Sequence, residues 1–526
     1  MGQQDAHVGD EEGVPMHKEA GENSTTLMIS QQSEVSNTRI KFDLKHESKL
    51  LFNLAIPSVA LQLSMYFLFP QTASMIGRHL GTEELAGFSL ASLTGNLTCL
   101  SIIIGALTAT ETLMPRAFGM GDYAEVGLIA VRGFIVCTLL LAIPMIPLIT
   151  CMDSILMALG QDPTASKLAS DWIRIYILGI PATLLFRVFQ RFLATQNVVW
   201  PLVYAGLAGC FLVEPILLET LVPTMGFLGS GVALVLTQTT QALLLMLYLN
   251  FQHVHHPETW PGLSFSLLKQ AIEPAPMIHF MKLSLGGVLS LSEWWFWEIM
   301  CFMAGTFGVI PLCVHTIAYQ LIPLLFMVPL GISIGMSIRI GTVLAHDVEK
   351  AKTIAKYSVA LTCVVAVCMS TLLYKLKRPI VLLFTSDAEV IKGCDDIWMK
   401  LCIDVIVLFI FSINGGILRA LGLQWRMALS IFVVLWCGAL PVMYHYSVVK
   451  GGGLDSLWTL LPCFYAILDV VTFLCYYTAD WHAISKGINE RDRKSALLDE
   501  VPDESTYLIS RERAESIGRE SQRSIA

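Results

Sequence analysis

Twelve apolar stretches, each long enough to cross a lipid bilayer, constrain this sequence more than any other feature. A spanning α-helix needs about 20 mostly apolar residues, and lipid-embedded backbone must satisfy its hydrogen bonds internally. The sequence therefore predicts an all-α polytopic membrane protein with twelve transmembrane helices. The stretches begin near Leu50, Leu85, Gly127, Trp172, Pro201, Gly229, Met277, Pro311, Ile354, Asp396, Arg426 and Leu457.

The composition agrees with a membrane protein and excludes several other classes. Only 14% of the 526 residues are charged, whereas a soluble domain has about 25%. Most of the net charge of −8 lies in polar tails, so it says little about a substrate, and no basic stripe indicates nucleic acid. The 13 cysteines are spread singly through apolar segments. Their spacing fits neither a disulfide framework nor a metal site, and no cofactor is predicted.

One long polar break, residues 251–276, divides the apolar segments into six and six. The two halves resemble each other weakly: Phe192–Pro201 lies between the fourth and fifth segments of its half, as Ile417–Trp425 does in the other. Many transporters are built from internal repeats, with the site near the membrane midplane between them. We predict a disordered N-terminal tail (1–45), a first lobe (46–250), an inter-lobe loop (251–276), a second lobe (277–478) and a disordered C-terminal tail (479–526).

An even number of spans places both termini on one side of the membrane. The predicted short loops on that side are rich in Lys and Arg, which indicates the cytoplasm. Lys375, Lys377 and Arg378 fall on the other side. The basic residues assigned to the tails' side are Arg116, Arg191, Lys269, Arg339, Lys350, Lys352 and Arg426.

A short motif in the C-terminal tail bears on location. Glu504, Leu508 and Ile509 fit an acidic dileucine pattern, which would bind sorting adaptors; a solvated tail without that role is the alternative. We expect a plasma-membrane protein, with an endosomal or vacuolar membrane as the alternative, and a monomer.

The stretch Ser292–Met300 is the main candidate site, because it places two acids among tryptophans in an apolar segment. Carboxylates inside a bilayer are costly and mark proton, ion or substrate sites by default. Burial favours the neutral form of a carboxyl group and a nearby cation favours the charged form. One site can therefore hold either a proton or an organic cation. The alternative is that the tryptophans are interfacial and a glutamate bonds a neighbouring helix.

The helical positions of these residues separate Glu293 from Glu298. Five residues correspond to about 140° of rotation, so the two acids cannot face one ligand from an ideal helix. Glu293 shares a face with Trp297, and Trp294 shares one with Glu298. A carboxylate beside an aromatic ring suits a bulky cation, since cation–π attraction contributes about 2 kcal/mol when desolvated. We therefore expect Glu293 and Glu298 to have different roles.

Several motifs occur in order along residues 46–478: Gly77–Ala86, Thr110–Gly119, Gly160–Pro163, Glu293–Glu298, Met327–Gly331, Ser337–Gly341 and Gly415–Arg419. Together they resemble the motifs of the multidrug and toxin extrusion (MATE) transporters. The resemblance implies a secondary antiporter with two six-helix lobes around a central cavity, which expels organic cations and drugs in exchange for protons or sodium. The paired glutamates resemble the eukaryotic branch, which is typically proton-coupled.

The sequence departs from the family pattern at several acids. The eukaryotic pattern has a glutamate in the eighth segment, where Gln320 stands, and another in the tenth, where Leu408 stands. Gln320 is either a cavity-lining hydrogen-bonding group or a packed amide, and Asp404, one turn before Leu408, is a candidate substitute. Two secondary candidates lie in the first half. Glu111 resembles a family position near the cytoplasmic end of the second segment, and a structural hydrogen bond is the alternative role for it. Glu214 begins the stretch Glu214–Leu218, which stands where prokaryotic relatives have Asn-Pro-x-x-Asp.

The sequence thus predicts an antiporter, not an enzyme, with small organic cations or drugs as its substrates. A sodium-coupled exporter of the same architecture is one alternative. A lipid-linked-sugar flippase is another, and we would expect basic residues in its cavity. An intramembrane enzyme would need a nucleophile–base pair or a metal cluster within the spans, and a scaffold or receptor would not need acids beside tryptophans in mid-segment.

Overall fold

In the computed structural model, every regular element of the described part of the chain is a helix. From Lys49 onward the chain forms one compact unit. The sorting motif at Glu504, Leu508 and Ile509 lies outside the described residues. The structure describes residues 44–499 except 160, 253, 261, 263, 385 and 386.

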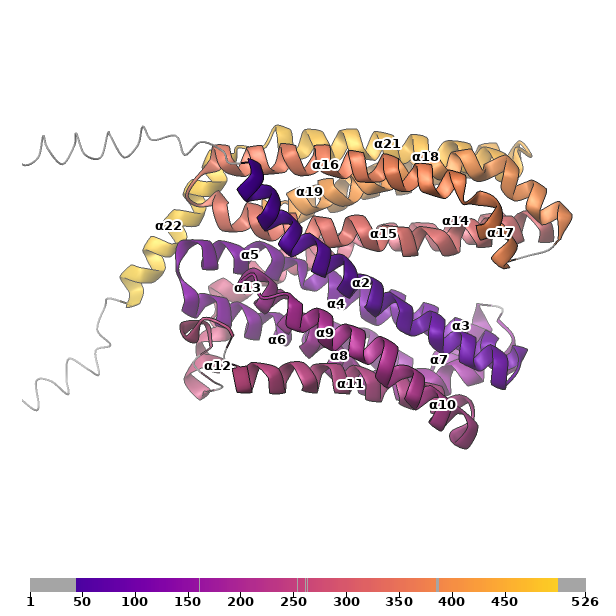
Figure 1. Cartoon of the computed structure of the whole chain (residues 1–526), viewed down its shortest axis with the longest axis horizontal. Coiled ribbons are helices and arrows are strands. Elements are labelled where there is room, and N and C mark those ends of the chain that lie inside the picture. The colour runs from indigo at the N-terminus through magenta and orange to yellow at the C-terminus, as the bar shows by residue number, and fades with distance from the viewer. Residues whose placement is uncertain are drawn as a thin grey trace, which may run out of the picture. The chain divides into compact units, whose positions relative to one another are not determined.

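The helices of the first half run lengthwise beside one another and are coloured indigo to magenta in Figure 1. Two short π-helical pieces interrupt them, η1 (Asn96–Leu100) and η2 (Gly209–Val213). The α-helices are α2 (Leu44–His79), α3 (Thr82–Gly95), α4 (Ser101–Ala106), α5 (Thr108–Met120), α6 (Tyr123–Thr150), α7 (Met152–Ala158), α8 (Pro163–Thr195), α9 (Trp200–Ala208), α10 (Glu214–Met225) and α11 (Phe227–Gln252).

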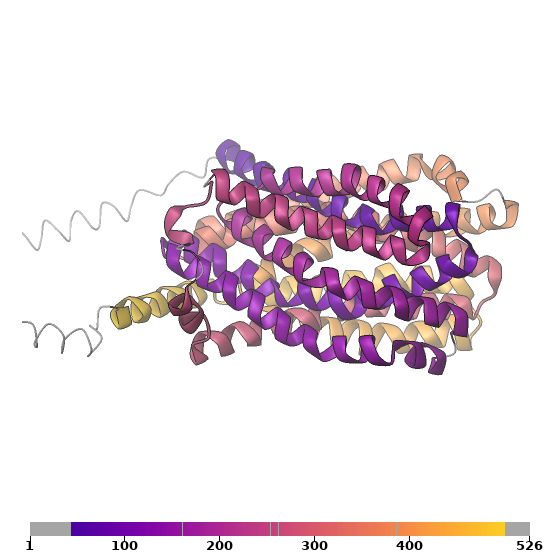
Figure 2. The same cartoon turned by 90° about the horizontal axis from the view of Figure 1, so that it is seen from below.

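In Figure 1 the helices of the second half from α14 to α21 form a second group, coloured salmon to yellow, while α13 lies beside α5 and α6 of the first half. Figure 2 shows the same arrangement from a perpendicular direction. Two π-helical pieces, η4 (Phe432–Ala439) and η5 (Tyr444–Val449), lie in the fifth span of this half. The α-helices are α13 (Pro274–Ser290), α14 (Ser292–Gly305), α15 (Val309–Leu344), α16 (Val348–Lys375), α17 (Lys377–Phe384), α18 (Ala388–Ala420), α19 (Gln424–Ile431), α20 (Leu440–Met443), α21 (Gly453–Tyr477) and α22 (Trp481–Asp499).

The internal repeat is visible in the lengths of corresponding spans. The third span has 28 residues in each half, the fourth has 33 and the fifth has 26. Aspartates begin corresponding helices: Asp122 and Asp347 cap α6 and α16, and Asp162 and Asp387 cap α8 and α18, each accepting a backbone N–H. A side-chain oxygen at this position satisfies a free N–H of the first turn. The same number of residues separates the two members of each pair, so the predicted two-lobe repeat is confirmed.

Within the described residues, eleven of the twelve predicted spans are helical stretches long and apolar enough to cross a membrane. The seventh is not among them, because it divides at Leu291 into α13 and α14. A similar one-residue turn at Leu107 separates α4 from α5 within the second span. Discontinuous helices of this kind frequently form the sites of transporters. The break comes two residues before Glu293, so it fixes where that side chain points.

We define the proximal end of the bundle as the end where α5, α15, α18 and α21 finish. Near it the two halves approach closely through glycine. An added Cβ at Gly119 would collide with the backbone of Thr342, and one at Gly341 would lie 2.8 Å from Pro115 Cβ. Nearer mid-span, Gly287 of α13 packs against Gly105. The two lobes are therefore in close contact from mid-span to the proximal end.

Two predicted polar segments contain helices. The inter-lobe segment 251–276 includes η3 (Pro257–Thr259) and α12 (Phe265–Ala271), and Ser264 caps α12. The segment after residue 478, predicted to be disordered, begins with α22. That prediction was wrong for residues 481–499, because Trp481 and Ile488 give one face of α22 apolar side chains that are buried.

Candidate functional site

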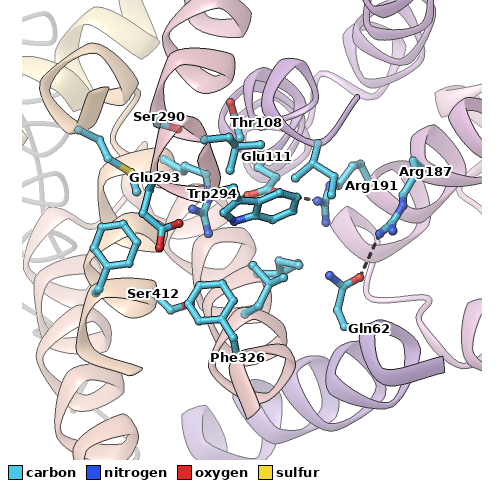
Figure 3. Close-up of a pocket in the computed structure, with 17 residues that line it drawn as sticks. Gln62, Thr108, Glu111, Arg187, Arg191, Ser290, Glu293, Trp294, Phe326 and Ser412 are labelled. Carbon is cyan, nitrogen blue, oxygen red and sulfur yellow. Dashed lines mark hydrogen bonds and ion pairs between the residues drawn. The ribbon is translucent and has the colours of Figure 1, made fainter. Parts of the chain in front are cut away.

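A cavity of about 50 Å³ lies between the two lobes, at the depth of the break in the seventh span. Its lining residues come from α2, α4, α5 and α8 of the first half and from α13, α14, α15, α18 and α19 of the second. Figure 3 shows its wall, including Gln62, Thr108, Glu111, Arg187, Arg191, Ser290, Glu293, Trp294, Phe326 and Ser412.

Glu293 lies in the wall of this cavity and is 5% exposed. Its Oε1 accepts hydrogen bonds from Trp297 Nε1 at 2.8 Å and from the hydroxyl of Tyr465, on α21, at 2.6 Å. Hydrogen bonds to a charged acceptor are stronger than those between neutral groups. The site can therefore hold a carboxylate in a largely apolar setting.

Glu298 occupies a different environment on the same helix. Its Oε1 accepts a hydrogen bond from the hydroxyl of Tyr319, on α15, at 2.7 Å, and its side chain is not part of the cavity wall. Close by, Cys301 Sγ lies 3.3 Å from His315 Nε2. The predicted separation of the two glutamates onto different faces of one helix is confirmed.

Trp294 and Trp297 of this stretch both lie beside Glu293, although the spacing had placed Trp294 on one face with Glu298. Trp297 is buried and bonded to Glu293, as predicted from their spacing. Trp294 lies in the cavity wall, and its indole ring points between Glu293 and Arg191 in Figure 3. An aromatic ring therefore stands beside Glu293 within the cavity, where a bound cation would meet both.

Asp404, on α18, is fully buried, and among the described residues neither of its carboxylate oxygens has a hydrogen-bond partner. It interacts electrostatically with Glu293 and with Asp469 on α21. Asn414 Nδ2 donates to Asp469 Oδ1 at 3.3 Å, and the hydroxyl of Tyr476 donates to Asn414 Oδ1 at 3.2 Å. The second lobe thus contains a chain of buried acids behind Glu293.

Sequence reasoning missed Asp469, although a signal was present. Asp469 is an acid well inside an apolar span, like Glu293, and the same criterion would have selected it. At the repeat spacing, the first lobe has Leu68, Gly179 and Leu244 in place of Glu293, Asp404 and Asp469. The acid chain is therefore particular to the second lobe.

Gln320 does not join the site. It is exposed on α15 and is not part of the cavity wall. Helical rotation explains this: the preceding residue, Tyr319, points inward to Glu298. Neither role considered for Gln320, a cavity-lining group or a packed amide, fits its exposed position.

Glu111 lies at the proximal end of the cavity and binds two arginines. Arg191, on α8 of the first lobe, approaches Glu111 Oε1 at 2.6 Å, and Arg419, on α18 of the second lobe, approaches Oε2 at 2.8 Å. Arg419 Nη2 also donates to Ser333 Oγ at 2.7 Å. We call Glu111, Arg191 and Arg419 the latch, because Glu111 joins the two lobes through it.

Further hydrogen bonds cross between the lobes around the latch. Arg116 Nη2 donates to the carbonyl oxygen of Ala420 at 2.7 Å. Gln424 Nε2 donates to Thr112 Oγ1 at 2.7 Å, and the Thr112 hydroxyl donates to the carbonyl oxygen of Arg419. Arg116 and Arg191 are buried within α5 and α8, so their assignment to loops was wrong.

Arg187 lies one helical turn before Arg191 and also faces the cavity. Its Nη1 donates to Gln62 Oε1 at 3.1 Å and to Gln190 Oε1 at 3.4 Å, while its Nε has no partner. Sequence reasoning missed Arg187, although a charged residue inside an apolar span is the same signal that selected Glu293.

Glu214 is buried at the start of α10, away from the central cavity. Its Oε1 accepts a hydrogen bond from the Thr72 hydroxyl at 3.0 Å, and its Oε2 has no hydrogen-bond partner in the part of the chain that the structure describes. The following residue, Pro215, lines a second hollow with Gln71 and Arg78. Of the two secondary candidates, the structure brings only Glu111 to the central cavity.

Known proteins resemble this chain along most of its length. The family model MatE matches residues 57–218 and 287–444, one stretch in each half. Multidrug and toxin extrusion protein 1 of Danio rerio is 30% identical over 485 residues, covering 91% of this chain and 80% of the relative. The human protein of the same name is 30% identical over 436 residues, covering 82% and 74%.

Solved structures support the same fold. The crystal structure of the eukaryotic MATE transporter AtDTX14 matches with a TM-score of 0.78 at 22% identity, covering 85% of this chain and 99% of that one. A MATE in a bent conformation matches with a TM-score of 0.71 at 16% identity.

Proposed function

Because the chain belongs to the multidrug and toxin extrusion (MatE) family, we propose that it is a secondary active antiporter that exports organic cations and drugs in exchange for protons. The observation that carries this proposal is Glu293, a buried carboxylate in the wall of a cavity between two lobes, beside the ring of Trp294. A proton and an organic cation compete for such a group. This competition couples release of the cation to binding of the proton.

The hydrogen bonds to Glu293 support its role as the shared site. Tyr465 and Trp297 both donate to one oxygen, Oε1, which leaves Oε2 for a proton or a ligand. When a cation leaves, the carboxylate is stabilised only by these neutral donors, and protonation removes the cost of a buried charge. Proton binding therefore follows cation release.

Asp404 and Asp469 extend the proton-binding capacity into the second lobe. Asp404 has no hydrogen-bond partner and is close to two other acids. Carboxyl groups that are close together resist being charged at the same time. A proton at Asp404 therefore makes it easier for Glu293 to be charged when it binds a cation.

The latch supports alternating access. The lobes are joined at the proximal end through Glu111 and Arg419, and we infer from the positive-inside bias that this end faces the cytoplasm. Arg191 belongs to the same lobe as Glu111, so that ion pair can persist while Arg419 separates.

The size of the cavity also supports alternating access. Its volume of about 50 Å³ is smaller than the ~300 Å³ of ordinary ligand pockets. The lobes must therefore move apart to admit a substrate.

Transport in proteoliposomes tests the proposal. An outward-directed proton gradient is expected to drive uptake of tetraethylammonium by the wild type and not by Glu293→Gln, with both proteins reconstituted in equal amounts. Replacing sodium at fixed pH separates proton from sodium coupling. No uptake under any imposed pH gradient would contradict proton-driven cation export.

We also propose location in the plasma membrane, with both termini cytoplasmic and adaptors binding at Leu508 and Ile509. Imaging a tagged protein with and without these two residues tests this location, since loss of the motif should redistribute the protein only if it is read by adaptors.

A further inference from the structure

Three basic residues of the second lobe lie far from the central cavity, at the distal end of the bundle, which is the end opposite the proximal end. Lys375 ends α16, and Lys377 and Arg378 begin α17. With the proximal end facing the cytoplasm, they lie on the side where Lys and Arg are usually scarce. Their place at this end is therefore not explained by topology.

One of these three bases is neutralised within the chain. Lys377 forms an ion pair with Asp395 of α18. Lys375 and Arg378 are exposed, and neither forms an ion pair in the part of the chain that the structure describes. Two positive charges at the distal end can therefore meet a partner from outside the chain.

The helix α17 presents apolar side chains beside these charges. It turns out of line with α16, across the length of the bundle (Figure 1), and Val381 buries it against the bundle. Leu382 lies one turn after Arg378, so the two share a face. Leu382 and Phe384 are 52% and 48% exposed. This arrangement is typical of a helix at a membrane surface, whose apolar side chains enter the acyl region while its bases meet the headgroups.

The corresponding helix of the first lobe shows that such a helix does not need basic residues. At the repeat spacing, α7 begins where α17 begins. It has an exposed apolar residue, Met157, where α17 has Leu382, but it has the acid Asp153 where α17 has Arg378. The bases are therefore particular to α17, and they indicate a partner with negative charge.

We propose that α17 is a lipid-binding surface. Lys375 and Arg378 bind the phosphate groups of anionic phospholipids in the leaflet at the distal end, while Leu382 and Phe384 enter the acyl region. A guanidinium binds phosphate oxygens through two parallel hydrogen bonds, and an ammonium binds them as a point charge. The surface is independent of the proposed function, because it involves neither the central cavity nor proton binding.

Two lipids that differ only in their headgroup test this surface. The purified full chain is placed in nanodiscs of dioleoylphosphatidylcholine, either alone or mixed with dioleoylphosphatidylglycerol, and hydrogen–deuterium exchange is measured. We expect exchange in α17 to be at least about fivefold slower with the anionic lipid, because each base near an anionic surface strengthens binding by about that factor. High salt should remove the slowing, and α7 should exchange equally in both nanodiscs.

Variants assign the binding to the two exposed bases. The double variant Lys375→Gln/Arg378→Gln should lose the slowing, whereas Lys375→Arg/Arg378→Lys keeps both charges and should keep it. Arg78→Gln/Lys167→Gln is the matched control, because it removes two exposed bases from the distal end of the first lobe. It should leave the slowing in α17 unchanged.

Several outcomes would overturn the lipid-binding surface. Equal exchange of α17 in the two nanodiscs would do so, as would slowing that persists in the double glutamine variant. Slowing of α7 to the same extent would indicate a general effect of an anionic bilayer. Slowing by soluble glycerophosphate in pure phosphatidylcholine would indicate a site for free phosphate groups and not for lipid. Failure of pH-driven tetraethylammonium uptake with the effect on α17 intact would overturn only the proton-coupled export.

Discussion

Arg419 of the second lobe contacts Glu111 of the first through an ion pair of 2.8 Å from Nε to Oε2. Glu111 holds Arg191 of its own lobe through the other oxygen. The buried carboxylate of Glu111 is therefore shared between Arg191, which moves with it, and Arg419, which moves away when the lobes separate. This relationship makes the latch the contact that an opening at the proximal end must break.

Removing Arg419 should loosen the proximal end without unfolding either lobe. In Arg419→Gln, Glu111 keeps Arg191, so no buried charge is left without a partner. The free energy of unfolding should therefore fall by about 1–3 kcal/mol, the contribution of a charge-assisted hydrogen bond. Hydrogen–deuterium exchange should rise in α5 and near residues 415–420. Arg426→Gln is the control, because Arg426 Nη1 donates to the Cys475 carbonyl within its own lobe at 3.0 Å. Unchanged exchange at α5 would contradict the latch.

Neutralising Glu293 and neutralising Glu298 should impair transport in different ways. Glu293→Gln removes the acid from the cavity wall, so substrate binding, exchange and gradient-driven uptake should all fall. Glu298→Gln alters a group bonded to Tyr319 away from that wall, so cation affinity should persist while gradient-driven uptake falls. The measurement is binding and uptake of tetraethylammonium in parallel. Equal loss of affinity in both variants would show that the two acids share one role.

Asp404 should be a site where stability and transport conflict. A fully buried acid without hydrogen-bond partners is unfavourable in either charge state. Asp404→Leu should therefore raise stability by about 1–4 kcal/mol, the range seen when buried charged groups become apolar, and should abolish proton-driven uptake. Thermal unfolding of the detergent-solubilised protein and proteoliposome uptake measure the two effects.

A nearby acid on the surface provides the comparison for Asp404. Asp455→Asn removes an exposed carboxylate bonded to Lys400. It should change neither the thermal stability nor the proton-driven uptake measurably, because surface ion pairs contribute about 0–1 kcal/mol to stability. If Asp404→Leu transported normally, Asp404 would have no part in coupling.

Close contact at Gly287 should be necessary for the lobes to come together. A Cβ there would collide with both Thr108 Oγ1 and the carbonyl oxygen of Gly105, and the backbone atom cannot move aside like a flexible side chain. Gly287→Ala should therefore reduce transport, and Thr108→Ala should not rescue it. Gly305→Ala is the control, because nothing lies within 4 Å of an added Cβ there. Normal transport by Gly287→Ala would show that this contact is dispensable.

The sequence predicted those features that depend on local patterns. Apolar length was sufficient to locate the spans, and residue spacing separated Glu293 from Glu298. It did not predict that Arg419 would meet Glu111, because the two are far apart in the chain and only lobe packing joins them. Arg187 was missed because acids, and not basic residues, were sought inside the spans. Gln320 was misplaced because family position was taken as orientation, while the structure turns Tyr319 inward.

The helix α22 should stabilise the proximal end. Trp481 is buried and donates to the Tyr476 carbonyl at 2.9 Å. Ser485 and Asn489 both donate to the carbonyl oxygen of Ala345, next to His346, which contacts the Gly119 carbonyl of the first lobe. Trp481→Ala should therefore lower the free energy of unfolding by about 3 kcal/mol, as truncation of a buried tryptophan does.

Two truncations distinguish this helix from the chain beyond it. A chain ending after residue 480 loses both hydrogen bonds to Ala345 and the Trp481 contacts, so its apparent Tm should fall and exchange should rise around His346. A chain ending after residue 499 keeps α22 and should match the full chain in both measurements. Because both variants lack the sorting motif, only α22 differs between them. Equal Tm values for the two truncations would show that α22 contributes nothing to the closed proximal end.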